Sequence, residues 1–106
     1  MADLAGHVVV ITGGETGIGR ATVELLAEQG ATLVIGGVLP EEGEATVTAV
    51  RSTGGKAEFV LTDVREREQV EALIEGAVAR HGKIDVLINN AAVFDGFVNV
   101  LETTDG

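Results

Sequence analysis

Apolar residues along the chain fall alternately into short runs and longer helical patterns. The runs at 7–12, 32–35, 57–61 and 84–88 are apolar and largely β-branched, as in strands buried on both faces of a sheet. The segments 18–30, 41–52 and 70–81 between them have helical spacing or helix-forming composition, and Gly30 and Gly82 follow as helix stops. The chain is therefore predicted to alternate strand and helix from its first strand to its fourth.

Each predicted helix has an expected apolar side. The members are Ile18, Ala21, Thr22, Leu25 and Leu26 in the first helix, Val47 and Val50 in the second, and Val70, Leu73, Ile74, Ala77 and Val78 in the third. Strands and helices that alternate in units of roughly 30 residues imply right-handed crossovers between parallel strands. The fold class is predicted to be α/β, with a Rossmann-like, doubly wound parallel sheet.

Composition excludes several classes of function. The 106 residues allow one domain at most, and the chain has no cysteine, which rules out disulfides, zinc–thiolate sites and cysteine nucleophiles. A formal charge of −10 disfavours nucleic acid and anionic membranes as partners. No export signal or membrane anchor is visible, so cytoplasm is the expected compartment. Neither His7 nor His81 has the spacing or acidic neighbours of a metal site, and no metal is expected.

A glycine-rich turn follows the first predicted strand. Thr12-Gly13-Gly14-Glu15-Thr16-Gly17-Ile18-Gly19 stands directly before a predicted helix. A pyrophosphate needs such a turn, because it must approach the main chain closely and face the free N–H groups of a helix start. A Walker loop would end in Gly-Lys-Ser/Thr, which this turn lacks, so a nucleoside triphosphatase is disfavoured.

Three segments in register carry a family resemblance. The glycine turn, Asp63-Val64 after the third strand and Asn89-Asn90-Ala91-Ala92 after the fourth resemble the short-chain dehydrogenase/reductase family, in its classical branch. The resemblance implies that residues 1–106 are the N-terminal part of a single dinucleotide-binding domain. It also implies hydride transfer between a nicotinamide cofactor and an alcohol or carbonyl substrate, by a parent protein that forms homo-oligomers.

The resemblance also implies roles for individual residues. Thr12 would tie the turn together, and Asn89 would brace the sheet. Asp63 and Val64 would grip the adenine ring through a carboxylate and a backbone N–H, although Asp63 could also cap the next helix. The full set of expected cofactor contacts is Gly13, Glu15, Thr16, Gly17, Ile18, Gly19, Gly37, Asp63, Val64, Asn90, Ala91 and Ala92. Ala92 stands where the family usually has glycine, a departure of one methyl group.

Two positions bear on the choice of cofactor. About 20 residues past a glycine turn of this kind, an acidic side chain would hold the ribose 2′-hydroxyl of NAD. Gly37 stands there instead, and Glu41 and Glu42 are expected on the next helix. An NADP site would need a basic residue, whereas Glu15 would repel a 2′-phosphate. NAD is therefore favoured over NADP by exclusion.

The residues that the family uses for catalysis are not found. The resemblance implies a Ser, a Tyr and a Lys four residues later, and the Tyr would transfer the proton. The 106 residues contain no tyrosine, and Asn99 precedes the helix expected to start near Thr103 or Thr104. We therefore expect no catalytic residue in this chain, and no activity from the chain alone.

The sequence also predicts an incomplete sheet. A doubly wound sheet has two βαβαβ halves, and these residues supply one half plus a strand of the other. The strand at 84–88 would be left as an open apolar edge, a hazard for aggregation. We expect the chain to be the N-terminal part of a longer protein or a product of early termination. The alternatives are a non-catalytic nucleotide-binding module, or a half-sheet that a partner chain completes.

Overall fold

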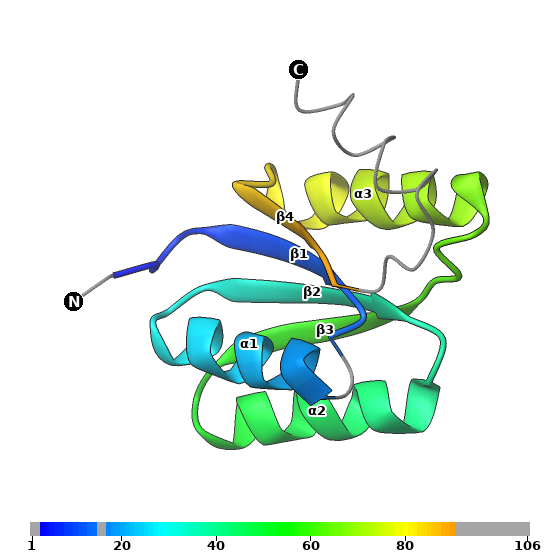
Figure 1. Cartoon of the computed structure of the whole chain (residues 1–106). Coiled ribbons are helices and arrows are strands. Elements are labelled where there is room, and N and C mark those ends of the chain that lie inside the picture. Colours follow the sequence, from blue (N-terminus) through cyan, green and yellow to red (C-terminus); the bar gives the residue numbers. More distant parts are fainter. Residues whose placement is uncertain (1–2, 15–16, 91–106) are drawn as a thin grey trace.

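The computed structural model describes residues 3–14 and 17–90. Strands and helices alternate through these residues (Figure 1). Their bounds are β1 (Val8–Thr12), α1 (Gly17–Glu28), β2 (Thr32–Gly37), α2 (Pro40–Ser52), β3 (Lys56–Leu61), α3 (Arg67–His81) and β4 (Val86–Asn89).

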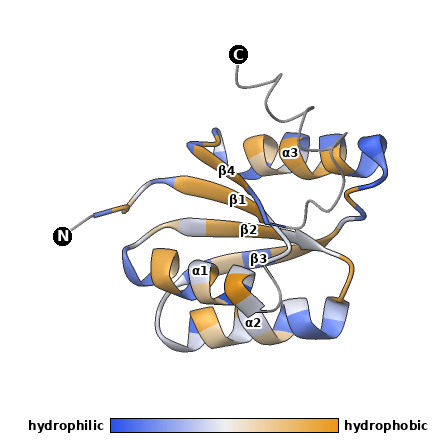
Figure 2. Ribbon diagram, viewed as in Figure 1, coloured by the Kyte–Doolittle hydropathy of each residue, from blue (hydrophilic) through white to orange (hydrophobic). Residues whose placement is uncertain are grey.

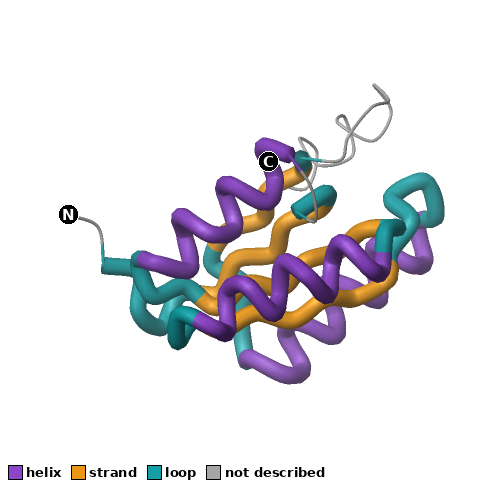
Figure 3. The backbone as a smooth tube through the Cα atoms, turned by 90° about the horizontal axis from the view of Figure 1, so that it is seen from below, coloured by secondary structure: helices purple, strands orange, loops and turns teal. Residues whose placement is uncertain are grey.

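The four strands form one parallel sheet in the order β3-β2-β1-β4. Figure 3 shows them running side by side, with the helices lying along them. The predicted α/β class with a Rossmann-like sheet of four strands and three helices is confirmed. Because all pairs are parallel, the carboxyl ends of the strands lie at the same end of the sheet. The expected cofactor contacts lie at this end.

The central strand β1 is buried along its whole length, because its side chains alternate between two apolar layers. Val9 and Ile11 pack with α1 and α2 on one face, whereas Val8 and Val10 pack beneath α3 on the other. Figure 2 shows the apolar strands between helices that carry polar stretches. Helices α1 and α2 therefore cover one face of the sheet, and α3 covers the other.

The apolar side predicted for α1 is only partly correct, because Leu26 packs against the core while other members do not. Ile18 is 79% exposed and Leu25 is 55% exposed, while Gly19, Val23 and Ala27 are buried. Small side chains form the buried face because α1 lies close to the sheet at its first turn, where Gly19 meets the end of β1. The predicted side of α2 is correct, since Val47 and Val50 are buried.

The apolar stripe of α3 is partly covered. Leu73 and Ala77 are buried against the sheet, but Val78 is exposed. The helix ends, as expected, in a left-handed Gly82 with a φ of 85°, whose N–H donates to the Val78 carbonyl. This conformation favours glycine.

The last strand begins later than predicted, at Val86 rather than at residue 84. Ile84 instead packs against the core beneath α3 from the preceding turn, and Asp85 uses its carboxylate to bind the start of β1. The first strand likewise begins at Val8 and not at His7. In the described sheet β4 is an edge strand with Val86 and Leu87 exposed, as the sequence predicted.

Candidate functional site

The glycine turn that follows the carboxyl end of β1 contains residues with positive φ angles, a conformation that favours glycine. Gly13 has a φ of 75° and its N–H donates to the Gly36 carbonyl at 2.8 Å, which holds the turn against the end of β2. Gly17, the first residue of α1, has a φ of 58°. Residues with side chains are disfavoured at a positive φ, so the backbone conformation of the turn explains why glycine stands at both positions. Glu15 and Thr16 lie outside the described residues.

Close packing at Gly19 brings the helix start against the strand end. A Cβ at Gly19 would overlap the Gly13 carbonyl and come within 2.7 Å of the Asn90 side-chain nitrogen. Asn90 also binds the start of the turn. Its side-chain nitrogen donates to the Gly13 carbonyl at 3.3 Å, and its backbone N–H donates to the Thr12 carbonyl at 3.0 Å. The turn and the segment after β4 therefore form one surface. Ala91 and Ala92 lie outside the described residues.

Thr12 and Asn89 fix the base of this surface. The Thr12 hydroxyl donates to the Asn89 side-chain oxygen at 2.9 Å, which joins the carboxyl ends of β1 and β4. Thr12 is buried and Asn89 is half-buried. The bracing role expected of Asn89 agrees with this contact.

Gly17 has room beside it among the residues that the structure describes. Apart from its two chain neighbours, none of these residues has an atom within 4 Å of a Cβ built on Gly17, and Ile18 is 79% exposed. The first N–H groups of a helix have no partner within the helix and carry its positive dipole end. No acidic side chain lies in the first turn of α1 to occupy them. The arrangement can accept an anionic group against bare main chain.

Asp63 is held by its own neighbours. Its carboxylate accepts hydrogen bonds from the Arg65 guanidinium at 3.0 and 2.9 Å and from the Arg65 N–H at 3.0 Å. These bonds, the side-chain contact foremost, lower the pKa of Asp63. The Asp63 N–H donates to the Gln69 side chain at 2.7 Å. Asp63 is not the cap of α3, because that helix begins at Arg67 after Glu66, so the capping alternative is wrong.

The end of β2 has no carboxylate. Gly37 is buried and its carbonyl accepts from the Thr62 N–H at 2.7 Å, which aligns the ends of β2 and β3. The next residues, Val38 and Leu39, are exposed and apolar. As expected, Glu41 and Glu42 lie in the first turn of α2.

Sequence reasoning missed two features of the site. Gly36 lets β2 pack closely beneath α3, because a Cβ there would come within 2.6 Å of the Leu73 side chain and 3.2 Å of the Thr62 hydroxyl, and only the packing of distant elements reveals this. The pairing of Arg65 with Asp63 had a visible signal, since an Asp two residues before an Arg can form a local turn.

Other kinds of site find no support in the described part of the chain. No three histidine, aspartate or glutamate residues among 3–14 and 17–90 come together as metal ligands. Within the same residues no helix is long and apolar enough to cross a bilayer.

Val64 is half-buried beside Asp63. The expected contacts that the structure describes therefore gather at the carboxyl ends of the four strands.

Comparison with known proteins agrees with this geometry. Residues 7–106 match the family model of the short chain dehydrogenases. A 2,5-dichloro-2,5-cyclohexadiene-1,4-diol dehydrogenase of Sphingobium indicum is 44% identical over 93 residues, which are 88% of this chain and 36% of that protein. Tropinone reductase-like 2 of Erythroxylum coca is 40% identical over 88% of this chain and 33% of its own length.

Solved structures give the same result. A dehydrogenase/reductase from Sinorhizobium meliloti superposes with a TM-score of 0.83 at 34% identity, over 87% of this chain and 37% of that one. A hydroxysteroid dehydrogenase from Escherichia coli gives 0.81 at 30% identity, over 85% and 38%. The chain thus spans between a third and two fifths of the length of these relatives.

Proposed function

The chain belongs to the short-chain dehydrogenase family, and on this premise we propose that it is the dinucleotide-binding part of an oxidoreductase. The parent protein would transfer hydride between a nicotinamide cofactor and an alcohol or carbonyl substrate. The observation that carries the proposal is at Gly17, where the helix after a buried strand begins: its φ is positive, and no atom of the described residues beyond its chain neighbours lies within 4 Å of a Cβ built there. Glycine at that position lets a pyrophosphate approach the main chain.

The proposed pyrophosphate contacts are the main chain of Gly13, Gly17, Ile18 and Gly19, with Glu15 and Thr16 completing the turn. Gly19 supports this assignment, because its close approach to Gly13 brings the first turn of α1 beside the strand end. Asn90 would border the adenosine ribose together with Ala91 and Ala92. Its bond to the Gly13 carbonyl places its side chain next to the turn.

We assign the adenine end to Asp63 and Val64. The Asp63 carboxylate already accepts from Arg65, but two carboxylate oxygens have about four lone pairs, so an adenine amine can still be accepted. The Val64 N–H would donate to a ring nitrogen.

We propose NAD rather than NADP as the cofactor. The end of β2 near the expected ribose offers Gly37, Val38 and Leu39, with neither the acid typical of NAD sites nor a base for a 2′-phosphate. Glu15 in the turn adds a negative charge, which would repel a 2′-phosphate. The NAD preference therefore follows from repulsion of NADP.

The chemistry would be divided between the cofactor and residues beyond this chain. The bound nicotinamide would supply or accept the hydride. The 106 residues contain no tyrosine, so the proton donor that the family resemblance implies is not among them. We propose that the chain alone is inactive and that the parent acts as a homo-oligomer on a small alcohol or ketone. Cytoplasm remains the expected compartment.

Ligand-observed NMR with NAD and NADP tests the proposal. Saturation transfer from the protein should be seen for the adenosine protons of NAD and should be weaker for NADP. Gly17→Val should abolish it, because the side chain would fill the space for the phosphates. Gly54→Val is the matched control, since Gly54 also has a positive φ and open surroundings but lies at the opposite end of the sheet. Equal transfer in the wild-type protein and Gly17→Val would place the ligand elsewhere.

A further inference from the structure

The Asp63 carboxylate accepts three hydrogen bonds from a single residue. The backbone N–H and the Nε–H of Arg65 both donate to Oδ1 at 3.0 Å, and a terminal amino group of its guanidinium donates to Oδ2 at 2.9 Å. The two oxygens of a carboxylate offer about four acceptor positions. With the partners that the described residues supply, about one position remains, on Oδ2. The Asp63 side chain keeps 25% of its surface exposed, so a donor can reach it.

The main chain beside this carboxylate offers a single donor. The Asp63 N–H donates to the Gln69 side-chain oxygen at 2.7 Å, so it is occupied. The next N–H along the chain, that of Val64, has no hydrogen-bond partner among residues 3–14 and 17–90. The end of β3 therefore presents one acceptor followed by one donor.

An acceptor followed by a donor is the pattern that complements adenine. The adenine ring presents its exocyclic amine as a donor and the adjacent ring nitrogen N1 as an acceptor. Hypoxanthine, a 6-oxopurine, presents the reverse pattern, with a carbonyl oxygen in place of the amine and a hydrogen on N1. Against the same protein groups it would place acceptor against acceptor and donor against donor, and groups left unpaired in this way weaken binding.

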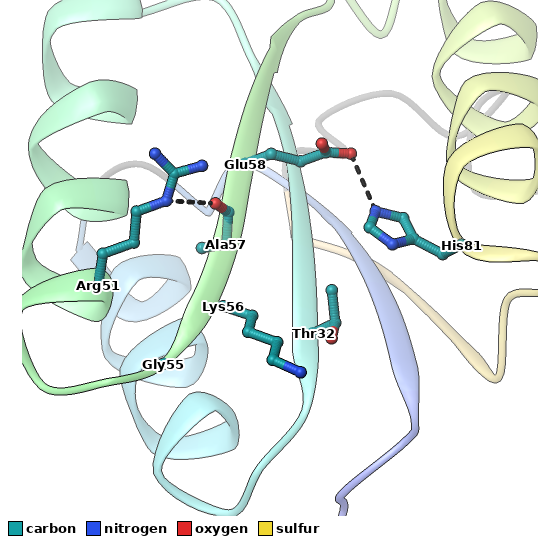
Figure 4. A pocket seen from close by; sticks show the side chains of 7 residues that line it. All are labelled: Thr32, Arg51, Gly55, Lys56, Ala57, Glu58 and His81. Carbon is teal, nitrogen blue, oxygen red and sulfur yellow. Dashed lines mark hydrogen bonds and ion pairs between the residues drawn. The ribbon is translucent and has the colours of Figure 1, made fainter.

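The pairing of Arg65 joins no two elements of the fold. Other arginines do so around a hollow at the amino ends of β2 and β3, the opposite end of the sheet. Arg51 reaches from α2 to donate to the Ala57 carbonyl of β3 at 3.1 Å (Figure 4), and Arg80 of α3 donates to Glu58 of β3 at 2.8 Å. Arg65 instead lies two residues from its partner, within one turn. Its effect is therefore on the position of the carboxylate.

We propose that Arg65 and Gln69 are positioning residues that make the site selective for adenine over 6-oxopurine bases. Arg65 holds the Asp63 carboxylate so that its remaining acceptor position is fixed, and Gln69 occupies the competing N–H. Groups that are ordered before the ligand arrives cost less to order on binding. Both residues act on the adenine end of the proposed dinucleotide site, so this inference rests on the proposed function.

Amide NMR titrations with NAD and with nicotinamide hypoxanthine dinucleotide test the selectivity. The two dinucleotides differ at the 6-position of the base and carry the same charge at neutral pH, so the ratio of their dissociation constants cancels general electrostatic effects. The wild-type protein should bind NAD about tenfold more tightly, because the mismatched base leaves polar groups unpaired. Arg65→Gln should lower this ratio to about threefold, because a mobile carboxylate must be ordered by the ligand.

Three further variants complete the experiment. Arg65→Lys separates geometry from charge, since lysine keeps the charge but lacks the planar fork, and it should give the same lowered ratio as Arg65→Gln. Gln69→Ala should lower the ratio as well, because the freed Asp63 N–H could donate to the carbonyl of hypoxanthine. Arg67→Gln is the matched control, because it removes an exposed positive charge two residues further along, and it should keep the wild-type ratio.

The outcomes separate this inference from the proposed function. NAD binding with an unchanged ratio in Arg65→Gln or in Gln69→Ala would overturn the role of that residue and leave the dinucleotide site standing. Equal binding of both dinucleotides by the wild-type protein, or a wild-type ratio in Arg65→Lys, would also overturn the selection by geometry. The absence of saturable shifts with NAD would overturn the dinucleotide site itself, and the inference with it.

Discussion

Thr12 and Asn89 stand 77 positions apart, and the hydroxyl of one donates to the side-chain oxygen of the other at 2.9 Å. At the opposite end of the same strand pair, the Val8 N–H donates to the Asp85 carboxylate at 2.8 Å. Side-chain hydrogen bonds therefore join β1 and β4 at both ends of their pairing. The bond between Thr12 and Asn89 lies directly beneath the proposed cofactor turn, so it supports both the sheet and the site.

Replacing Thr12 by Val should destabilise the protein by about 1–2 kcal/mol, because a buried hydroxyl bond is lost and Asn89 loses its donor. Urea unfolding followed by circular dichroism measures the change. Thr48→Val on the exposed side of α2 is the control and should change stability by less than about 0.5 kcal/mol. Equal effects of the two substitutions would show that the Thr12 bond contributes nothing.

Asp85 should make stability sensitive to acid. The Val8 N–H, and then Lys83, lower its pKa in the folded protein. A folded pKa below the unfolded one means that the charged form stabilises the fold above about pH 4, and that this contribution is lost as the pH falls through the folded pKa. In Asp85→Asn, the urea midpoint should therefore fall less between pH 7 and pH 3. Glu75→Gln, at an exposed site on α3, should keep the wild-type pH dependence, and the same profile in Asp85→Asn would contradict the assignment.

Arg65→Gln should raise the pKa of Asp63 toward its ordinary value, because the guanidinium bonds that lower it are lost. Carboxyl-carbon NMR over a pH titration reads this directly. Arg67→Gln removes the same charge two residues further along and should leave Asp63 unaffected. An unchanged pKa in Arg65→Gln would mean that the pairing with Asp63 does not persist in solution.

Leu73→Ala should cost about 2–5 kcal/mol, because Leu73 is 1% exposed and its loss leaves a cavity beneath α3. Val78→Ala on the exposed side of the same helix should cost less than about 1 kcal/mol. Thermal and urea unfolding of the two variants provide the comparison. Similar losses would show that α3 is not anchored through Leu73.

The order and type of the elements could be predicted because buried strands and helices differ in length and spacing. The buried side of α1 could not, because its contacts use Gly19 and Ala27, whose small size lets the helix approach the sheet. A search for large apolar residues selects Ile18 and Leu25 instead, which are exposed. The start of β4 was missed because Asp85 binds the main chain of β1, which no periodicity reveals.

The candidate site was predictable where the backbone dictates the residue type. Gly13 and Gly17 have positive φ angles and Gly19 contacts the strand end, so their spacing is visible in the sequence. The contact of Asp63 with Gln69 could not be predicted, because it depends on side-chain geometry, whereas the pairing with Arg65 was missed although its two-residue spacing signals it. Gly36 depends on Leu73, a residue on a distant helix.

Binding of a dinucleotide to the main chain between β1 and α1 can be followed by amide NMR of the protein titrated with NAD, because this method detects even weak binding residue by residue. Saturable shifts are expected at Gly13, Gly17 and Gly19, together with Asn90 and Val64. Saturable shifts confined to other parts of the sheet, with the glycine turn unchanged, would contradict it.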